Sequence, residues 1–572
     1  MEFEKAANGR TRNPNTPSEV IAFDGRSRSA AMIESLEARI APATFVVTTL
    51  EDGGGRSLRG AIAAANESPG ADTIVFQPGL HGVINLTSRE IGITDTLSIK
   101  GPGSSKLGIS AGGISRVFEV LDPDGESPLS ISGLSFFSGD DGLNGDGGAI
   151  LSSESLKVKD CVFRENDADR QGGAIAVFDG SETAKVSVDI RDSVFVKNRN
   201  GAFGGGAVDI SVDGSIVLKN CLFAGNVSGT RGGALSISSA ESNVVRVEKC
   251  QFYNNRAPEH GALSLSLASG TAIIAGNEFI ANEAERAGGA AAIFGGSVTF
   301  DRNLVSQNRS FEQGGGLIVG QFSSLTISHS QFLKNTSQLS GSLGGGGGAI
   351  SIGGNELPGS TALIVDCLFD GNTSTRGGGI EVASSPFDLK IIGTSFFRNH
   401  STTEGGGIYI AAGTVPADSA SVKLMKSKIS NNVADNLGGG VFGAGDGVFQ
   451  VKSSILTGNV AAQGGGLYLG YTSGVLISNS VISTNNAESD GGGIVAASPL
   501  ELRDTKLMEN SSGGQGGGVY STNRLDVVES AVIRNFALTG GGIYQRSIES
   551  FSLLRSKVTD NVSQDLVQVV DA

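Results

Sequence analysis

The sequence predicts an all-β chain wound into a solenoid, on the strength of three observations. An apolar residue recurs three positions before an asparagine, as in Phe195-Val196-Lys197-Asn198. Each unit opens with two glycines, a small residue and an aliphatic one, as in Gly172-Gly173-Ala174-Ile175. Successive asparagines lie 25 to 37 residues apart, mostly near 26, and such a sustained period is typical of solenoids. The recurring asparagines are Asn166, Asn198, Asn226, Asn255, Asn282, Asn308, Asn335, Asn372, Asn399, Asn432, Asn459, Asn485, Asn510, Asn535 and Asn561.

The content of one repeat explains why the chain should coil. The glycine pair opens a short strand, residues 186–190 alternate as a second strand, and Val194-Phe195 form a third that ends at the asparagine. Three strands joined by tight turns make one triangular rung, and rungs pair in parallel about 4.8 Å apart. Inward Ile, Val and Phe side chains then form a long, narrow core.

The asparagines have a predicted structural role. A side-chain amide carries both donors and an acceptor, so one amide per rung can hydrogen-bond along the axis, whereas stacked aspartates would repel one another. The glycines are expected where φ is positive or where a neighbouring rung leaves no room for a Cβ. Burial of the ladder would block glycosylation at its members that fit N-x-S/T, which are Asn226, Asn308, Asn335, Asn372, Asn399, Asn510 and Asn561.

Four segments are predicted along the chain. They are a disordered polar segment with a sorting-type motif (1–43), a strand–helix–strand cap (44–82), irregular first coils (83–146) and the regular repeats (147–572). In the cap, Ser57–Asn66 is the predicted helix, with Ser57 as its N-cap, and it covers the otherwise open first coil. Two inserts, Ser337–Gly344 and Ala411–Ser419, are expected to protrude as loops.

Composition and charge restrict the function. The 572 residues carry a formal charge of −15, which argues against nucleic acid or an anionic membrane surface as the partner. No run of eighteen apolar residues is present, so no transmembrane helix is expected, and the first residues lack the apolar core of a secretory signal.

The four cysteines occupy one position of the repeat. Cys161, Cys221, Cys250 and Cys367 each stand two residues before the inward apolar residue, a place held elsewhere by residues such as Ser193. We therefore expect them to act as small residues in a stack, while a bridge between Cys221 and Cys250 stays open. No CxxC or Cys/His pair indicates zinc.

The alternation of GGA[ILV] with FxxN resembles the repeats of bacterial polymorphic outer-membrane proteins. It covers roughly Gly147 to Asn561. The resemblance implies a right-handed, single-stranded parallel β-helix of the pectin lyase-like type, here with about 17–18 coils and an N-terminal helical cap. The stretch Thr44–Phe76 resembles the cap of many bacterial surface β-helix proteins, and Ser35–Ala43 resembles a motif of exported planctomycete and verrucomicrobial proteins.

A search for catalytic or metal-binding groups gives only weak candidates. Asp160 and Asp192 share one position of consecutive repeats, with Asn220 next and Asp366 and Asp504 farther along. They could flank a cation, but we favour hydrated carboxylates on an outward face.

For three further patterns we prefer a purely structural interpretation over a binding or catalytic one. Asp140, Asp141 and Asp146 are read as a solvated turn rather than a weak Ca²⁺ site, and Gly101–Lys106 as a plain turn rather than a phosphate loop. The histidines show no triad order; they are His81, His260, His329 and His400. We predict no catalytic residue, cofactor or metal.

An aromatic residue recurs after the glycine-rich opening of later repeats. Tyr409, Tyr468, Tyr520 and Tyr544 could form a partly exposed stripe for sugar or protein contact. We favour the alternative, in which they pair with their neighbours on the sheet surface.

Together these features favour a non-catalytic extracellular or cell-surface protein of structural or adhesin type, associated with an outer membrane and contacting a surface glycan or protein. The alternative is a carbohydrate-binding or polysaccharide-degrading β-helix enzyme, a lyase or hydrolase. An enzyme should gather carboxylates, bases and aromatics in one concave patch. The oligomeric state stays open.

Overall fold

A computed structural model describes residues 42–121, 127–142, 145–180, 185–240, 243–338, 346–353, 360–383, 388–411, 421–445, 447–470, 472–546 and 550–564. The chain separates into two units, 1–41 and 42–572, and only the second contains described residues. The predicted disorder and sorting motif in 1–43, and most of the inserts Ser337–Gly344 and Ala411–Ser419, lie outside them.

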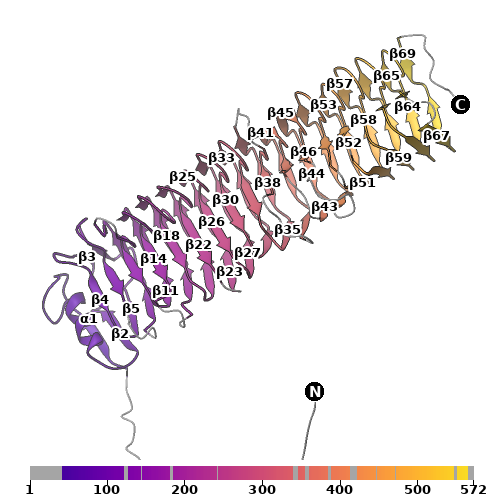
Figure 1. The fold of residues 1–572 in the computed structure, drawn as a ribbon. Coiled ribbons are helices and arrows are strands. Elements are labelled where there is room, and N and C mark those ends of the chain that lie inside the picture. Colours follow the sequence, from indigo (N-terminus) through magenta and orange to yellow (C-terminus); the bar gives the residue numbers. More distant parts are fainter. Residues whose placement is uncertain are drawn as a thin grey trace, which may run out of the picture. The chain divides into compact units, whose positions relative to one another are not determined.

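The second unit begins with a strand, a helix and a strand. β1 (Thr44–Val47) pairs in parallel with β2 (Asp72–Phe76), and α1 (Leu58–Asn66) lies between them in sequence. Ser57 begins the helix as predicted, because its Oγ accepts the Gly60 N–H at 3.1 Å. The buried face of α1 covers the first coils at the indigo end of Figure 1.

From there the chain forms a parallel β-solenoid whose regular rung has four strands. In one rung these are β14 (Ile175–Phe178), β15 (Val188–Arg191), β16 (Val194–Val196) and β17 (Arg199–Asn200). Equivalent strands stack into four sheets, here called sheets I, II, III and IV in that order, and each pairs in parallel with the next rung. The predicted three-stranded rung was therefore incomplete, because two residues after the ladder asparagine pair as a separate short strand.

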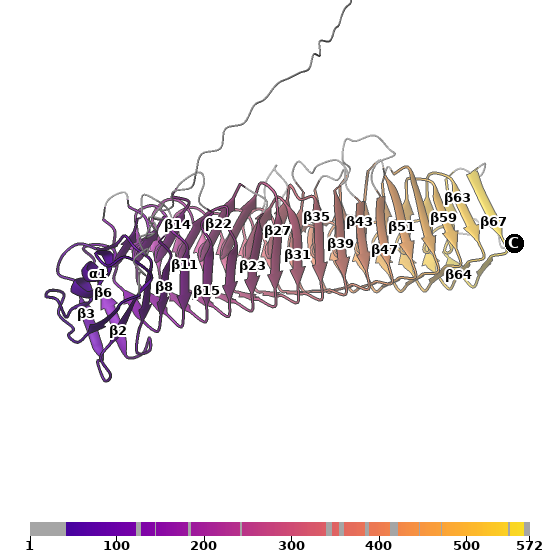
Figure 2. The same ribbon diagram turned by 90° about the horizontal axis from the view of Figure 1, so that it is seen from below.

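Sheet II gives the length of the solenoid. It holds 19 strands, from β1 to β67 (Phe551–Leu554), while sheet IV holds 15. Figure 2 shows the strands of sheet II in unbroken sequence along the axis. Nineteen strands make eighteen steps, so sheet II extends roughly 85 Å. The all-β solenoid of about 18 turns agrees with the predicted fold class.

The core is a column of stacked side chains. Phe163 and Phe195, from the middle of sheet III strands, are fully buried with ring centroids 4.9 Å apart and planes 4° apart. The same stacking joins Phe195 to Phe223 and Phe223 to Phe252, at 4.8 and 4.9 Å. Inward positions of sheets I and II add aliphatic columns, so the core is continuous along the axis.

Three positions of the regular rung recur in the left-handed conformation and turn the chain. In one rung they are Gly172 (φ 61°), Asp192 (φ 51°) and Lys197 (φ 53°). The second glycine has a different reason: a Cβ on Gly173 would lie 2.2 Å from the carbonyl oxygens of Arg199 and Gly206. His260 (φ 57°) takes the place of the first glycine in its own rung.

Length variation is confined to particular corners. Two residues connect sheet II to sheet III in each regular rung, as between β15 and β16, and two connect sheet III to sheet IV. The connection from sheet I to sheet II instead ranges from two residues, after β30 (Ala291–Phe294), to ten, between β46 (Ile408–Ile410) and β47 (Ser421–Met425). The connection from sheet IV to sheet I also varies, from three residues before β42 (Ile380–Val382) to twelve before β38 (Ile350–Ile352), so differences between rungs border sheet I on both sides.

Candidate functional site

The fifteen predicted ladder asparagines form one unbroken column, and all but the half-buried Asn561 are buried. Asn166 Nδ2 donates to Asn198 Oδ1 at 2.9 Å, the Asn166 backbone N–H donates to the same oxygen at 3.1 Å, and Nδ2 also donates to the Phe136 carbonyl at 3.2 Å. Every later step repeats the amide-to-amide bond at 2.9 to 3.1 Å. The predicted asparagine ladder is confirmed, and it is structural.

A second polar column, at the corner between sheets II and III, contains the cysteine position. Cys250 donates its backbone N–H to Asn277 Oδ1 at 2.8 Å, and Asn277 Nδ2 donates to Asn303 Oδ1 at 3.0 Å. These two asparagines were not predicted from the sequence, although each stands two residues before an inward apolar residue, as the cysteines do.

The cysteines behave as small buried members of that column. All four thiols are free, and the Cys221 backbone N–H donates to Cys250 Sγ at 3.4 Å, so the structure has no bridge there. Burial raises the pKa of the Cys161 and Cys367 thiols to about 12.

Asp160 and Asp192 lie on an outward turn, at the left-handed residue between sheets II and III. Asp160 has Lys159 Nζ at 3.9 Å, and Asp192 Oδ1 accepts the Asn220 side-chain amide at 3.0 Å. Both side chains are exposed, in agreement with hydrated carboxylates. Among the described residues, no group of three His, Cys, Asp or Glu side chains is arranged to hold a metal ion.

The predicted solvated turn at Asp140, Asp141 and Asp146 is wrong for Asp141. Its side chain is 0% exposed, with Arg116 Nη2 at 4.0 Å. Burial raises the pKa of Asp141 to about 6, although the Asp169 backbone N–H and Arg116 oppose this. The turn folds back against the neighbouring rung, which spacing within the turn could not indicate.

Two of the histidines contact polar side chains of their own or a neighbouring rung. His260 Nδ1 lies 2.9 Å from Ser264 Oγ, and burial lowers the pKa of His260 to about 4. His329 Nδ1 lies 2.9 Å from Asp301 Oδ1, and its Nε2 is 4.0 Å from Asp366 Oδ2. The His260 contact lies within one rung, whereas the His329 contacts join neighbouring rungs, and neither set contains a serine–histidine–carboxylate relay.

The predicted tyrosines belong to the outward column of sheet I. Tyr409 stacks on Phe442 (5.0 Å, 6°), and Phe442 stacks on Tyr468 (5.6 Å, 10°), while Tyr520 and Tyr544 form a further pair at 5.6 Å. Because each ring face covers its neighbour, the column presents ring edges rather than a platform for sugar stacking. The preferred interpretation is confirmed, and Phe442 is an additional member.

A buried carboxyl group stands next to this column. Glu381, 0% exposed, has Arg376 Nη2 at 3.3 Å and accepts the Ser351 hydroxyl at 3.2 Å. Burial raises the pKa of Glu381 to about 7, against the lowering effect of Arg376. The Arg376 guanidinium in turn lies over the Tyr409 ring at 5.0 Å. The group can titrate near neutral pH, but it is closed to a substrate.

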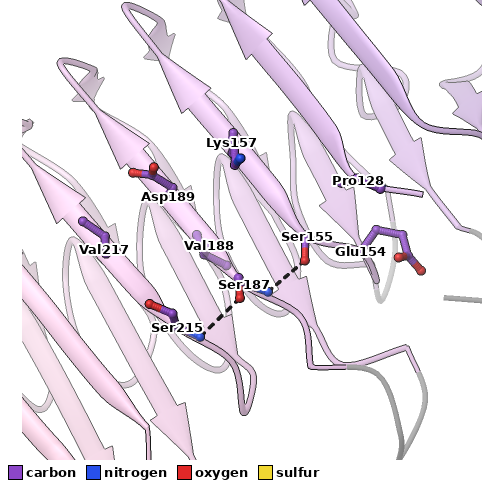
Figure 3. Close-up of a pocket in the computed structure, with 9 residues that line it drawn as sticks. All are labelled: Pro128, Glu154, Ser155, Lys157, Ser187, Val188, Asp189, Ser215 and Val217. Carbon is purple, nitrogen blue, oxygen red and sulfur yellow. Dashed lines mark hydrogen bonds between the residues drawn. The ribbon is translucent and has the colours of Figure 1, made fainter. Parts of the chain in front are cut away.

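An open hollow of about 470 Å³ lies where sheet I leads into sheet II. Ser155, Ser187 and Ser215 line one edge, as Figure 3 shows: the Ser187 N–H donates to Ser155 Oγ at 3.0 Å and the Ser215 N–H to Ser187 Oγ at 3.3 Å. Lys157 and Asp189 stand side by side on β11 (Leu156–Lys159) and β15. The other lining residues are Pro128, Glu154, Val188 and Val217.

Comparison with known proteins bears on the fold. A family model described as a right handed beta helix region matches residues 204–414. Together with the structure, it confirms the predicted right-handed parallel β-helix. The resemblance to polymorphic outer-membrane repeats stays a prediction.

No curated protein matches the chain. Among solved structures, the PL6-family alginate lyase AlyGC is 11% identical (TM-score 0.28; 92% of this chain, 90% of that one). Tailspike protein 3 of bacteriophage CBA120 is 11% identical (TM-score 0.25), and the match covers 92% of this chain and 62% of that one. The A-module of the Azotobacter vinelandii mannuronan C-5 epimerase AlgE6 is 12% identical (TM-score 0.22), and the match covers 90% of this chain and 98% of that one. These similarities are too weak to support a function.

Proposed function

We propose that this protein is a non-catalytic, extracellular β-helix of adhesin type that binds a glycan at the hollow beside sheet II. The hollow carries the proposal, because it is an open space of ligand size in which hydroxyl, ammonium and carboxylate groups face outward together. Most of the polar side chains that recur in every rung are instead buried, where they hydrogen-bond to one another in the two polar columns.

The serines of the hollow suit a ligand rich in hydroxyl groups. The hydroxyls of Ser155 and Ser187 already accept a backbone N–H, so each keeps its own proton as a donor. Lys157 adds a positive donor, and Asp189 adds an acceptor that Arg191 Nε orients at 2.5 Å. Val217 supplies apolar surface for the carbon face of a sugar.

Binding to a panel of neutral and acidic glycans tests the proposal. We expect the full chain to bind at least one member, and Lys157→Ala together with Asp189→Ala to weaken binding about tenfold or more. Lys159→Ala, an exposed change on the same strand but outside the hollow, is the control and should bind as the wild type does. Loss of affinity in the control alone, or no binding at all, would contradict the assignment.

Two further measurements examine the rest of the proposal. Incubation with the same glycans should release no reducing ends or unsaturated products; turnover would show an enzyme instead. Fractionation of the source cells, with protease added to intact cells, should find the protein exposed at the surface, and a cytoplasmic location would exclude the adhesin role.

Among the described residues, no helix has the length and apolar character needed to cross a bilayer.

A further inference from the structure

Five lysines gather on sheets II and III in the later part of the solenoid. They lie on three successive rungs, on or beside β43 (Asp388–Ile392), β47, β48 (Lys428–Ser430) and β51 (Val448–Lys452). Lys423 is half-buried and the other four are exposed. This lysine patch consists of Lys390, Lys423, Lys426, Lys428 and Lys452.

The sheet register holds these charges close together. Lys390 pairs directly with Lys423 on the next strand, so their backbones are about 4.8 Å apart. Like charges at directly opposed positions destabilise a sheet. In the same column, Leu363 precedes Lys390, and the uncharged Gln450 and Leu476 follow Lys423.

Nothing in the described part of the chain neutralises the patch. No described carboxylate oxygen lies within 4.0 Å of any of the five ammonium groups. The arginines on either side differ, because Arg398 Nη2 lies 2.7 Å from Asp370 Oδ2 and Arg503 pairs with Glu501.

The outward side of β43, β47 and β51 includes one carboxylate, that of Asp388. Its Oδ1 already accepts the Ser421 N–H at 3.1 Å and the Ser421 hydroxyl at 2.7 Å. A cluster of unpaired positive charge in a chain of net charge −15 is an attractive site for an external anion.

We propose that the lysine patch binds a linear anionic polysaccharide that lies along the solenoid axis. A polymer with a charge on each sugar unit would meet ammonium groups on successive rungs. Ser395 and Thr457, half-buried on the adjoining sheet III strands, offer hydroxyls to the sugar. A thin chain fits better than a bilayer, which would also press against Glu501 and Asp526 farther along sheet II.

This site is separate from the hollow. The hollow lies on β11, β15 and β19 (Ile216–Lys219), in the purple part of Figure 2, and the patch lies where β43, β47 and β51 are labelled. Each can therefore fail in an experiment without the other.

Binding of the full chain to polygalacturonate, heparin and dextran tests the proposal, with anionic phospholipid vesicles as a fourth probe. Polygalacturonate and heparin distinguish carboxylate from sulfate, and dextran is neutral. We expect binding to at least one anionic polysaccharide, weakening as salt rises, and none to dextran. A variant with all five patch lysines changed to Gln should bind at least about tenfold more weakly.

A matched variant controls for net charge. It carries five Lys→Gln changes outside both proposed sites, at Lys159, Lys197, Lys219, Lys249 and Lys334, and should bind within about twofold of the wild type. Circular dichroism shows whether both variants keep the β-fold; if the patch variant unfolds, the single changes Lys390→Gln and Lys426→Gln, at exposed positions, replace it. Equal losses in both variants, binding to vesicles alone, or no binding to either anionic polysaccharide would overturn the proposal.

Discussion

At the residue scale, each ladder asparagine satisfies the rung before it and the rung after it. The Asn485 Oδ1 accepts both the backbone N–H and the side-chain amide of Asn459, at 3.0 and 2.9 Å. Its own Nδ2 donates to Leu456 O and to Asn510 Oδ1. Removing one amide therefore leaves unpaired buried groups on both neighbours, which costs more than an average hydrogen bond.

Adjacent asparagines provide a matched test of that argument. Asn485→Ala should lower the free energy of unfolding by about 3 kcal/mol, because buried donors and acceptors lose their partners. Asn486→Ala makes the same chemical change at the next residue, which is exposed, and should cost less than about 0.5 kcal/mol. Denaturant unfolding followed by circular dichroism measures both. Equal effects would show that the ladder does not stabilise the fold.

Glu381 predicts a dependence of stability on pH. Its folded pKa is about 7, against 4.5 when unfolded, so the folded chain holds the proton more tightly. This contribution is fully present below about pH 4.5 and is lost as pH rises to about 7. Relative to Glu381→Gln, the wild type should lose up to about 3 kcal/mol across that range. Arg376 and Ser351 face the carboxyl group, and both remain in the variant.

Thermal melts between pH 4 and pH 8 compare the two proteins. Other buried carboxyl groups, such as Asp141 and Asp209, titrate in the same range, so the quantity to follow is the difference between the two curves. The exposed change Glu488→Gln serves as the control and should follow the wild type. A difference that does not vary with pH would contradict the prediction.

At the element scale, the glycine corner before each sheet I strand sets how closely rungs approach. The second glycine is packed between carbonyl oxygens of two other segments, as at Gly173. Gly474, at the start of β55 (Gly474–Ser478), has open space instead: a methyl group there would have no atom within 4 Å, and its φ lies outside the left-handed region. The same residue type thus serves a steric need in one element and none in the other.

Alanine substitution should separate these two glycines. Gly173→Ala places a methyl group 2.2 Å from two backbone oxygens, so we expect a loss of at least about 2 kcal/mol and a lower melting temperature. Gly474→Ala should be neutral or stabilise by up to about 1 kcal/mol, because the unfolded chain loses freedom. Similar melting temperatures for the two variants would refute the steric explanation.

The strands and their connections also show which features of the fold could be predicted from the sequence. The period, the inward apolar positions and the asparagine ladder were predictable, because the same residue pattern recurs in every repeat. The two-residue strands of sheet IV were not, since pairing between rungs rather than any local pattern defines them. Asp141 and the partners of His329 were missed for the same reason: their contacts come from residues about 25 or more positions away.

The candidate binding surfaces were less predictable still. The hollow depends on which outward side chains of β11 and β15 leave space between them, and the lysine patch on the register of β43 with β47. In sequence, Lys390 and Lys423 are 33 residues apart and belong to rungs joined by connections of unequal length. Only the register of the paired strands shows that these two lysines lie opposite each other.

At the scale of the whole solenoid, each inner rung is paired on both sides, whereas the last described rung is paired on one. Leu554 and Val562 in that rung are 51% and 54% exposed. Since stability in stacked repeats is largely a sum of nearest-neighbour contacts, the end should open more readily than the middle.

Hydrogen exchange measured by mass spectrometry tests this gradient. Amides of β67 and β68 (Lys557–Thr559) should exchange at least about tenfold faster than those of β31 (Ser297–Asp301) and β32 (Leu304–Ser306). Uniform protection along the chain would mean that the solenoid opens as one cooperative unit.

The sameness of the asparagine bonds has a consequence for how such a chain can change length. Asn282 donates to Asn308 in the same way as Asn308 donates to Asn335, so removing residues 283–308 as a block leaves Asn282 facing an equivalent partner. We expect that deletion variant to fold and to be shorter by one step of about 4.8 Å. A gene that loses or duplicates a whole repeat would therefore adjust the reach of its product in fixed increments, with the amide-to-amide bond of the ladder kept.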